Sequence, residues 1–111
     1  MEARATAKYI RGSAQKIRLV VDLIRGKNVN EALTILRFTK KRTCGDIVKV
    51  LKSAIANAEQ KAEGVDVDSL VVSKAYVNEG PRMKRVRPAP MGRAYRIQRR
   101  MSHISIHVSD K

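Results

Sequence analysis

The chain has 111 residues, of which 43% are hydrophobic, and its 24 lysines and arginines outnumber its 10 acids to give a formal net charge of +14. This length and apolar content predict one domain, residues 1–111, and the sequence lacks the run of about 20 apolar residues that spans a bilayer. So basic a chain needs a polyanionic partner, and nucleic acid is favoured over a membrane surface because the chain has no tryptophan and one phenylalanine.

The opening sequence, MEARATAKYI, lacks the apolar stretch of a signal peptide, and the single cysteine provides no disulfide framework. We therefore expect the protein in a reducing cytoplasm.

Residues 3–10 predict a first strand, because small or aromatic residues alternate there with polar ones at a period of two. The expected buried face holds Ala3, Ala5, Ala7 and Tyr9, and the expected outer face holds Arg4, Thr6 and Lys8. A helix should follow, with Ser13 as its N-cap and Gly26 at its end. Its apolar positions have the spacing of one helical face: Ile17, Val20, Val21 and Ile24.

Two further helices are expected. Asn28 and Glu31 have the spacing of a capping box, which predicts a second helix to about Phe38. We expect Thr39 to cap a third helix that Gly64 closes, about 24 residues long and about 36 Å at 1.5 Å per residue. Its apolar face reads Cys44, Ile47, Val48, Leu51, Ala54, Ile55, Ala58 and Ala62.

Two strands are predicted in the C-terminal half, at 70–77 from β-branched content and at 101–108 from alternation. Between them, residues 80–100 contain eight lysines or arginines, all three prolines and no acid. Such a segment has little to bury, so we expect it to leave the sheet and return as a basic arm about 30 Å long. The predicted fold class is α+β, with three helices on a small three-stranded antiparallel sheet and a long β-hairpin arm.

The charge is unevenly distributed along the chain. Residues 1–56, 57–79 and 80–111 have net charges of +9, −3 and +8. We expect four of the five acids of the middle segment to face solvent, away from the polyanion. They are Glu59, Glu63, Asp66 and Asp68.

No residue pattern points to catalysis or to a cofactor. His103 and His107 would lie about 13 Å apart along one strand, which is too far for both to bind one metal ion. Cys44 falls on an apolar helix face and is interpreted as a small core residue. The sequence has no phosphate-binding glycine loop and no recognisable pair of catalytic acids. We expect no enzyme activity, no cofactor and no metal.

The basic residues are therefore the candidate site. Seven of the eight cations in the arm are arginines, whose planar guanidinium suits phosphate and base stacking. Lys40, Lys41 and Arg42 form a further basic group at the expected start of the third helix. The residues predicted to bind RNA are Arg4, Lys8, Arg11, Lys16, Arg18, Arg25, Lys27, Arg82, Lys84, Arg85, Arg87, Arg93, Arg96, Arg99 and Arg100.

Three segments together resemble the bacterial large-subunit ribosomal protein number twenty-two, the L twenty-two family. They are SAQKIRLVVDLIRGKNVNEAL, VLKSAIANAE and NEGPRMKR…GRAYRI…RRMSHISIHVSDK, in the order and spacing of that family. The resemblance covers nearly the whole chain. It implies a body seated on large-subunit rRNA, beside neighbouring ribosomal proteins, and a role in subunit assembly.

The same resemblance implies that the arm lines the nascent-peptide exit tunnel and meets the nascent polypeptide. Its tip would be Pro88, Ala89, Pro90, Met91, Gly92, Arg93 and Ala94. Many relatives have a basic residue where this chain has Met91. No membrane contact and no homo-oligomer are expected. The alternative from another class is a free-standing architectural protein that binds duplex DNA or RNA.

Overall fold

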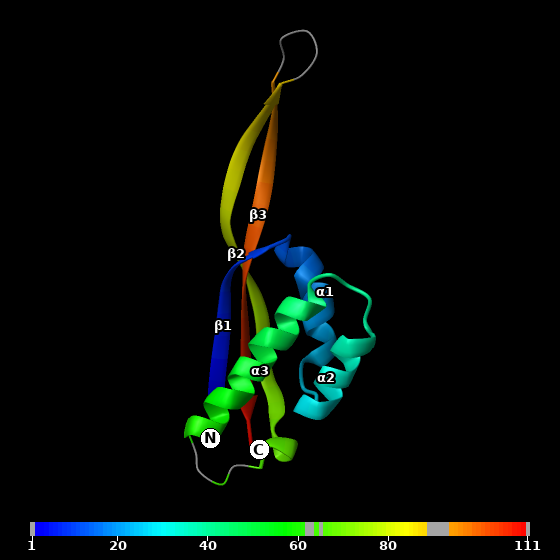
Figure 1. Cartoon of the computed structure of the whole chain (residues 1–111), viewed down its shortest axis with the longest axis vertical. Helices are drawn as coiled ribbons and strands as arrows, with labels where there is room; N and C mark the ends of the chain where they lie inside the picture. Colours follow the sequence, from blue (N-terminus) through cyan, green and yellow to red (C-terminus); the bar gives the residue numbers. More distant parts are fainter. Residues whose placement is uncertain (1, 62–63, 65, 89–93, 111) are drawn as a thin grey trace.

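The computed structural model describes residues 2–61, 64, 66–88 and 94–110, with side chains for all of these except 81–88 and 94–99. The molecule is elongated, with extents of 66 × 26 × 16 Å, and its long axis follows two strands that run past the helices (Figure 1). In chain order the elements are β1 (Glu2–Arg11), α1 (Ala14–Ile24), α2 (Val29–Phe38), α3 (Cys44–Lys61), the short 3-10 helix η1 (Val67–Ser69), β2 (Val71–Pro88) and β3 (Ala94–Ser109).

The three strands form one antiparallel sheet in the order β1-β3-β2, so the last strand of the chain lies in the centre. Across the sheet, Arg4 lies opposite His107 of β3, and His107 lies opposite Lys74 of β2. The helices cover one face, where α1 packs on β2 and α3 packs on β1 and β3 (Figure 1). The predicted α+β class is confirmed.

The core lies between the helices and the covered face of the sheet. The predicted face of α1 is buried as expected, and Cys44 is a core residue with 6% of its surface exposed. Each fully buried aliphatic side chain contributes about 1.5–3 kcal/mol by leaving water. The largest of them are Ile17, Ile24, Ile47, Leu51, Leu70, Ile104 and Ile106.

The caps of the first two helices agree with the expected boundaries. Ser13 is the N-cap residue of α1, although its side chain makes no capping hydrogen bond, and Gly26 follows the helix at φ +79. At the start of α2, the side chain of Asn28 accepts a hydrogen bond from the backbone N–H of Asn30. Nδ2 of Asn28 also donates to the carbonyl oxygen of Asp68, which connects the start of α2 to η1.

The expected start of the third helix was wrong. Thr39 is the C-cap of α2, with its backbone N–H and its Oγ1 both donating to the carbonyl of Ile35. The helix begins at Cys44 and has 18 described residues rather than about 24. A threonine hydroxyl can form hydrogen bonds at either end of a helix. The cap pattern alone therefore did not decide whether Thr39 begins one helix or ends another. Gly64 has φ +73, as a helix-closing glycine does, and Ala62 lies outside the described residues.

The expected inward position of Tyr9 was also wrong. A register shift between Ala7 and Ile10 places a bulge in β1, where Tyr9 has φ +61 and 60% of its surface exposed. Ile10 packs against the core in its place. A bulge adds one residue to the strand, so the alternation beyond it changes face.

The arm begins where β2 and β3 leave the helices. A register shift between Glu79 and Arg82 marks this point, and the ladder then runs from Arg82↔Arg100 to Pro88↔Ala94. Glycine suits position 80, because a Cβ there would lie 3.1 Å from the carbonyl oxygen of Met101, which is closer than most side chains approach. The expected hairpin arm is therefore present as a two-stranded ladder (Figure 1).

Contacts from the helix side of the molecule cover part of each edge of the sheet. At the β2 edge, Val72 exchanges backbone hydrogen bonds with the turn at Gly26 and Lys27. At the β1 edge, Asn57 Nδ2 and Lys61 Nζ of α3 donate to the carbonyls of Arg4 and Glu2, at 2.8 and 2.6 Å. Unpaired strand edges invite pairing with other chains, and these contacts occupy part of both.

No helix in the described ranges is long and apolar enough to cross a membrane.

Candidate nucleic-acid interface

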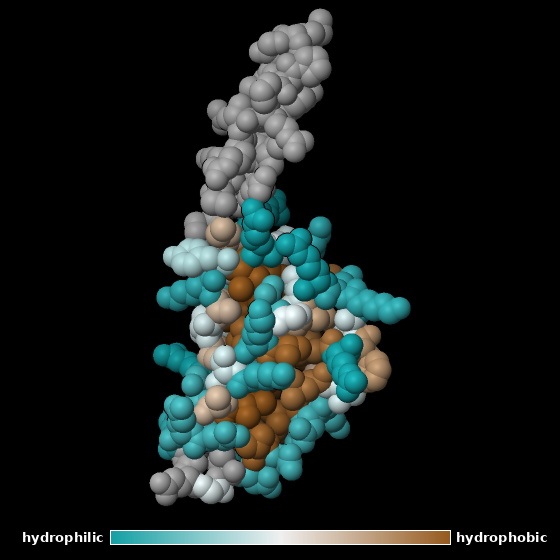
Figure 2. Space-filling model, in the orientation of Figure 1, coloured by the Kyte–Doolittle hydropathy of each residue, from teal (hydrophilic) through white to brown (hydrophobic). Residues whose placement is uncertain are grey.

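Five of the predicted RNA-binding cations extend from the body into solvent. Arg4 and Lys8 lie on the outer face of β1, which no helix covers, and Arg11 ends that strand. Lys16 lies in the first turn of α1, and Lys27 lies in the turn after it. Figure 2 shows hydrophilic side chains around the rim of the helical face, with apolar residues gathered between them.

Arg18 and Arg25 instead bind the protein itself. Arg18 donates from Nε and Nη2 to the carbonyl oxygen of Val77, at 3.0 and 2.7 Å. Arg25 makes the same pair of bonds to Ala75, at 3.1 and 2.6 Å, and its Nη1 lies 2.7 Å from Asp22. These two guanidinium groups, one from α1 and one from its C-cap residue, therefore bind the outer edge of β2. The sequence does not distinguish this role from phosphate binding.

For the cations of the arm, the structure gives the position of the backbone on each strand. Arg82, Lys84, Arg85 and Arg87 lie on β2, and Arg96, Arg99 and Arg100 lie on β3. One described pair of the ladder joins two cations, Arg82 and Arg100, whereas Met83 lies opposite Arg99. Of the expected tip at residues 88–94, positions 89–93, which include Arg93, lie outside the described residues. Its two ends, Pro88 and Ala94, form the last described pair of the ladder.

The sheet face without helices is polar and aromatic. The register puts Thr6 beside Ser105, with 3.1 Å between their hydroxyl oxygens, and Tyr76 on the other side of Ser105. Because β3 is central, Ser105 and His107 are buried on this face even though no helix covers it. The Tyr9 ring stands edge-on to His103 at 5.1 Å, and its backbone N–H donates to His103 Nδ1.

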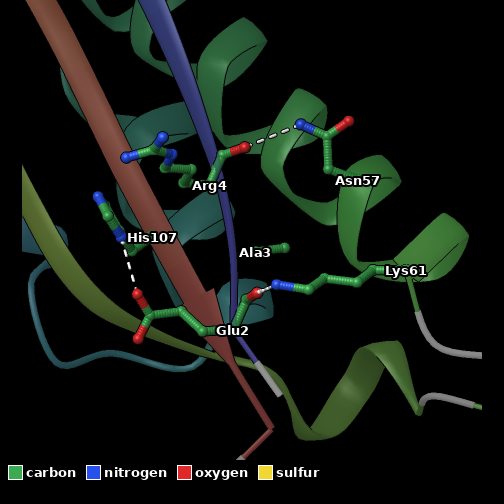
Figure 3. A pocket seen from close by; sticks show the side chains of 6 residues that line it. All are labelled: Glu2, Ala3, Arg4, Asn57, Lys61 and His107. Carbon is green, nitrogen blue, oxygen red and sulfur yellow. Dashed lines mark hydrogen bonds and ion pairs between the residues drawn. The ribbon is translucent and has the colours of Figure 1, made fainter.

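His107 connects this face to the N-terminal end of β1. Its Nδ1 lies 3.0 Å from Oε1 of Glu2, and this hydrogen bond holds the pKa of the Glu2 carboxyl below its ordinary value. Partial desolvation opposes the shift, and the charges of Lys74 and Lys61 support it. Figure 3 shows the pair beside a cavity that Asn57 and Lys61 also line. The volume of this cavity is about 410 Å³.

Lys41 and Arg42 lie close to Arg11 and Lys16 around one cavity. The sequence placed them at the start of a helix, whereas they belong to the loop between α2 and α3. The acids of the middle segment are exposed as expected at Glu59, Asp66 and Asp68, and Glu63 lies outside the described residues.

This fold and surface define a class of protein: a small basic α+β body with a two-stranded cationic arm, suited to a nucleic-acid partner. The family model for ribosomal protein L22p/L17e matches residues 5–109. The large ribosomal subunit protein uL22 of Solibacter usitatus is 65% identical over 111 residues, covering 100% of this chain and 98% of that protein. The uL22 of Thermoanaerobacter sp. is 60% identical, covering 100% and 99%. The chain belongs to the ribosomal protein L22p/L17e family.

Proposed function

We propose that this chain is a structural, non-catalytic constituent of the large ribosomal subunit that binds large-subunit rRNA. The observation that carries the proposal is the family match over nearly the full length of the chain. The net charge of +14 supports it, because a phosphate backbone is the partner that neutralises such a surface. Its place is the ribosome, which in bacteria lies in the cytoplasm.

We assign separate roles to the cations of the body and to those of the arm. We propose that residues 1–111 act as one rRNA-binding unit, in which Arg4, Lys8, Arg11, Lys16 and Lys27 anchor the body on rRNA. For Arg18 and Arg25, binding to the edge of β2 supports an indirect role, in which they keep the anchoring surface in shape. Neighbouring large-subunit proteins would complete the surroundings of the body.

The arm is the part that reaches away from the body. Its ladder from Arg82 to Pro88 and from Ala94 to Arg100 contains arginines on both strands and Lys84 on β2, which suits a wall built of RNA. We propose that residues 80–100 line the nascent-peptide exit tunnel, where the tip meets the growing polypeptide, and that the arm supports subunit assembly by joining separate rRNA segments.

Sedimentation tests the proposal. A tagged chain should move with the large subunit and stay there through a wash in moderate salt, and a density map of the subunit should contain the arm beside the tunnel. Binding to isolated rRNA should weaken steeply with salt, with a log-log slope of about −4 if six phosphates are neutralised. A chain that stays off ribosomes and binds duplex in trans would be a free-standing architectural protein instead.

A further inference from the structure

Three segments distant in sequence meet around a cavity of about 590 Å³. They are the end of β1, the first turn and a half of α1, and the loop between α2 and α3. We call this cavity the β1–α1 pocket. The residues that line it are Arg11, Gly12, Ser13, Lys16, Ile17, Leu19, Lys41, Arg42 and Thr43.

The rim of the β1–α1 pocket is cationic. Arg11, Lys16, Lys41 and Arg42 all line it, and none of its lining residues is acidic. All four side chains are exposed, and within the described part of the chain none of them forms an ion pair or a side-chain hydrogen bond. Four unneutralised cations around one concave site favour an anionic occupant.

The wall of the pocket is apolar, which an inorganic anion would not require. Ile17 is fully buried beneath it, and Leu19 exposes 63% of its surface beside it. Gly12, at φ +143, contributes no side chain, and a Cβ there would lie 3.3 Å from Cδ1 of Ile17. The pocket therefore offers an apolar surface next to positive charge.

We propose that the β1–α1 pocket binds one unpaired nucleotide of the rRNA. The base lies against Leu19 and the wall over Ile17, and its flanking phosphates are held by the four cations of the rim. Proteins recognise RNA mostly at unstacked bases in loops and bulges, and a base paired within a helix cannot enter a concave site. The inference rests on the proposed function and gives it one specific contact.

Two double variants, each of which removes two positive charges, test how much the rim of the pocket contributes to RNA affinity. Lys41→Ala/Arg42→Ala removes two cations of the pocket, whereas Lys40→Ala/Lys52→Ala removes two exposed cations that do not line it. The probe is a transcript of the large-subunit rRNA. We expect the pocket variant to lose about tenfold or more in affinity, since charged hydrogen bonds are lost. The matched variant should lose clearly less.

The base contact is tested by crosslinking. With 4-thiouridine in the transcript, the crosslinked peptide should contain residues 12–19, and Leu19→Ser should abolish that crosslink while leaving the melting temperature close to wild type. Equal losses for the two double variants, or crosslinks confined to other peptides, would show that the rim acts only as diffuse charge and would overturn the pocket proposal. If the wild-type chain itself does not bind rRNA, the proposed function fails instead.

Discussion

The guanidinium group of Arg25 donates two hydrogen bonds to the carbonyl oxygen of Ala75, from Nε at 3.1 Å and from Nη2 at 2.6 Å. Arg18 holds Val77 in the same way, two residues further along the strand. These contacts fasten α1 to the outer edge of β2 through side chains that the sequence would assign to RNA.

Arg18→Ala and Arg25→Ala should each lower the free energy of unfolding of the free protein by about 1–2 kcal/mol, because a charged donor pair to a backbone carbonyl is lost and water replaces part of it. Urea unfolding followed by circular dichroism measures the change. Lys52→Ala, at an exposed position of α3, is the control and should stay within about 0.5 kcal/mol of wild type. Unchanged stability in both arginine variants would show that these contacts do not support the fold.

Leu51→Ala should destabilise the body by about 2–5 kcal/mol, because Leu51 is fully buried and its loss leaves a cavity between α3 and the sheet. The same unfolding measurement applies. A melting temperature close to wild type would mean that the core can collapse around the missing side chain.

Shortening the arm should leave the body folded. Lys84 pairs with Gln98, so replacing residues 85–97 by an Asn-Gly turn keeps every remaining pair in register. Replacing 84–94 would instead join Met83 to Tyr95, which pairs with Arg87. We expect the melting temperature to be retained or raised, because a shorter loop costs less entropy and close cations are removed.

The register-matched deletion should still enter large subunits through its body. Its effect should appear in the handling of nascent chains or of drugs that bind the tunnel, measured by translation assays on ribosomes that carry the shortened protein. An unfolded body would mean that the arm belongs to the core. Unaltered translation and drug response would place the arm away from the tunnel.

The pair formed by Glu2 and His107 predicts a pH effect on stability. The folded-state pKa of Glu2 is lowered, chiefly by the hydrogen bond from His107, so the carboxylate adds stability above the ordinary pKa of about 4.3. That contribution is lost as the pH falls through the folded-state value. Wild type should therefore melt above Glu2→Gln at pH 7, and the difference should shrink towards pH 3. Glu59→Gln, an exposed change on α3, is the control. A gap between wild type and Glu2→Gln that is independent of pH would contradict this reading.

Patterns within single elements predicted most of the fold. The spacing of Ile17, Val20, Val21 and Ile24 placed the buried face of α1, because a helix has one period and its apolar residues follow it. The composition of residues 80–100 predicted the arm, since so many cations cannot enter a core. The family resemblance is confirmed by the match over residues 5–109.

Features that depend on contacts between elements could not be predicted from the pattern of a single element. The bulge at Tyr9 follows from pairing with β3, and the burial of Ser105 and His107 follows from the central place of that strand. The backbone carbonyls that Arg18 and Arg25 bind lie 50 or more positions away in sequence, so no local pattern indicates these contacts. The β1–α1 pocket likewise joins residues 11–19 to residues 41–43.

The central position of β3 sets the order in which the chain can fold. β1 and β2 are not neighbours in the sheet, so neither has its ladder partner until residues 94–109 have been synthesised. Hydrogen bonds within a helix are local, whereas strand pairing across such separations is slow. Until β3 has been synthesised, the apolar faces of α1, α2 and α3 therefore have no complete sheet to cover. The last strand of the chain thus supplies the ladder partner of both β1 and β2.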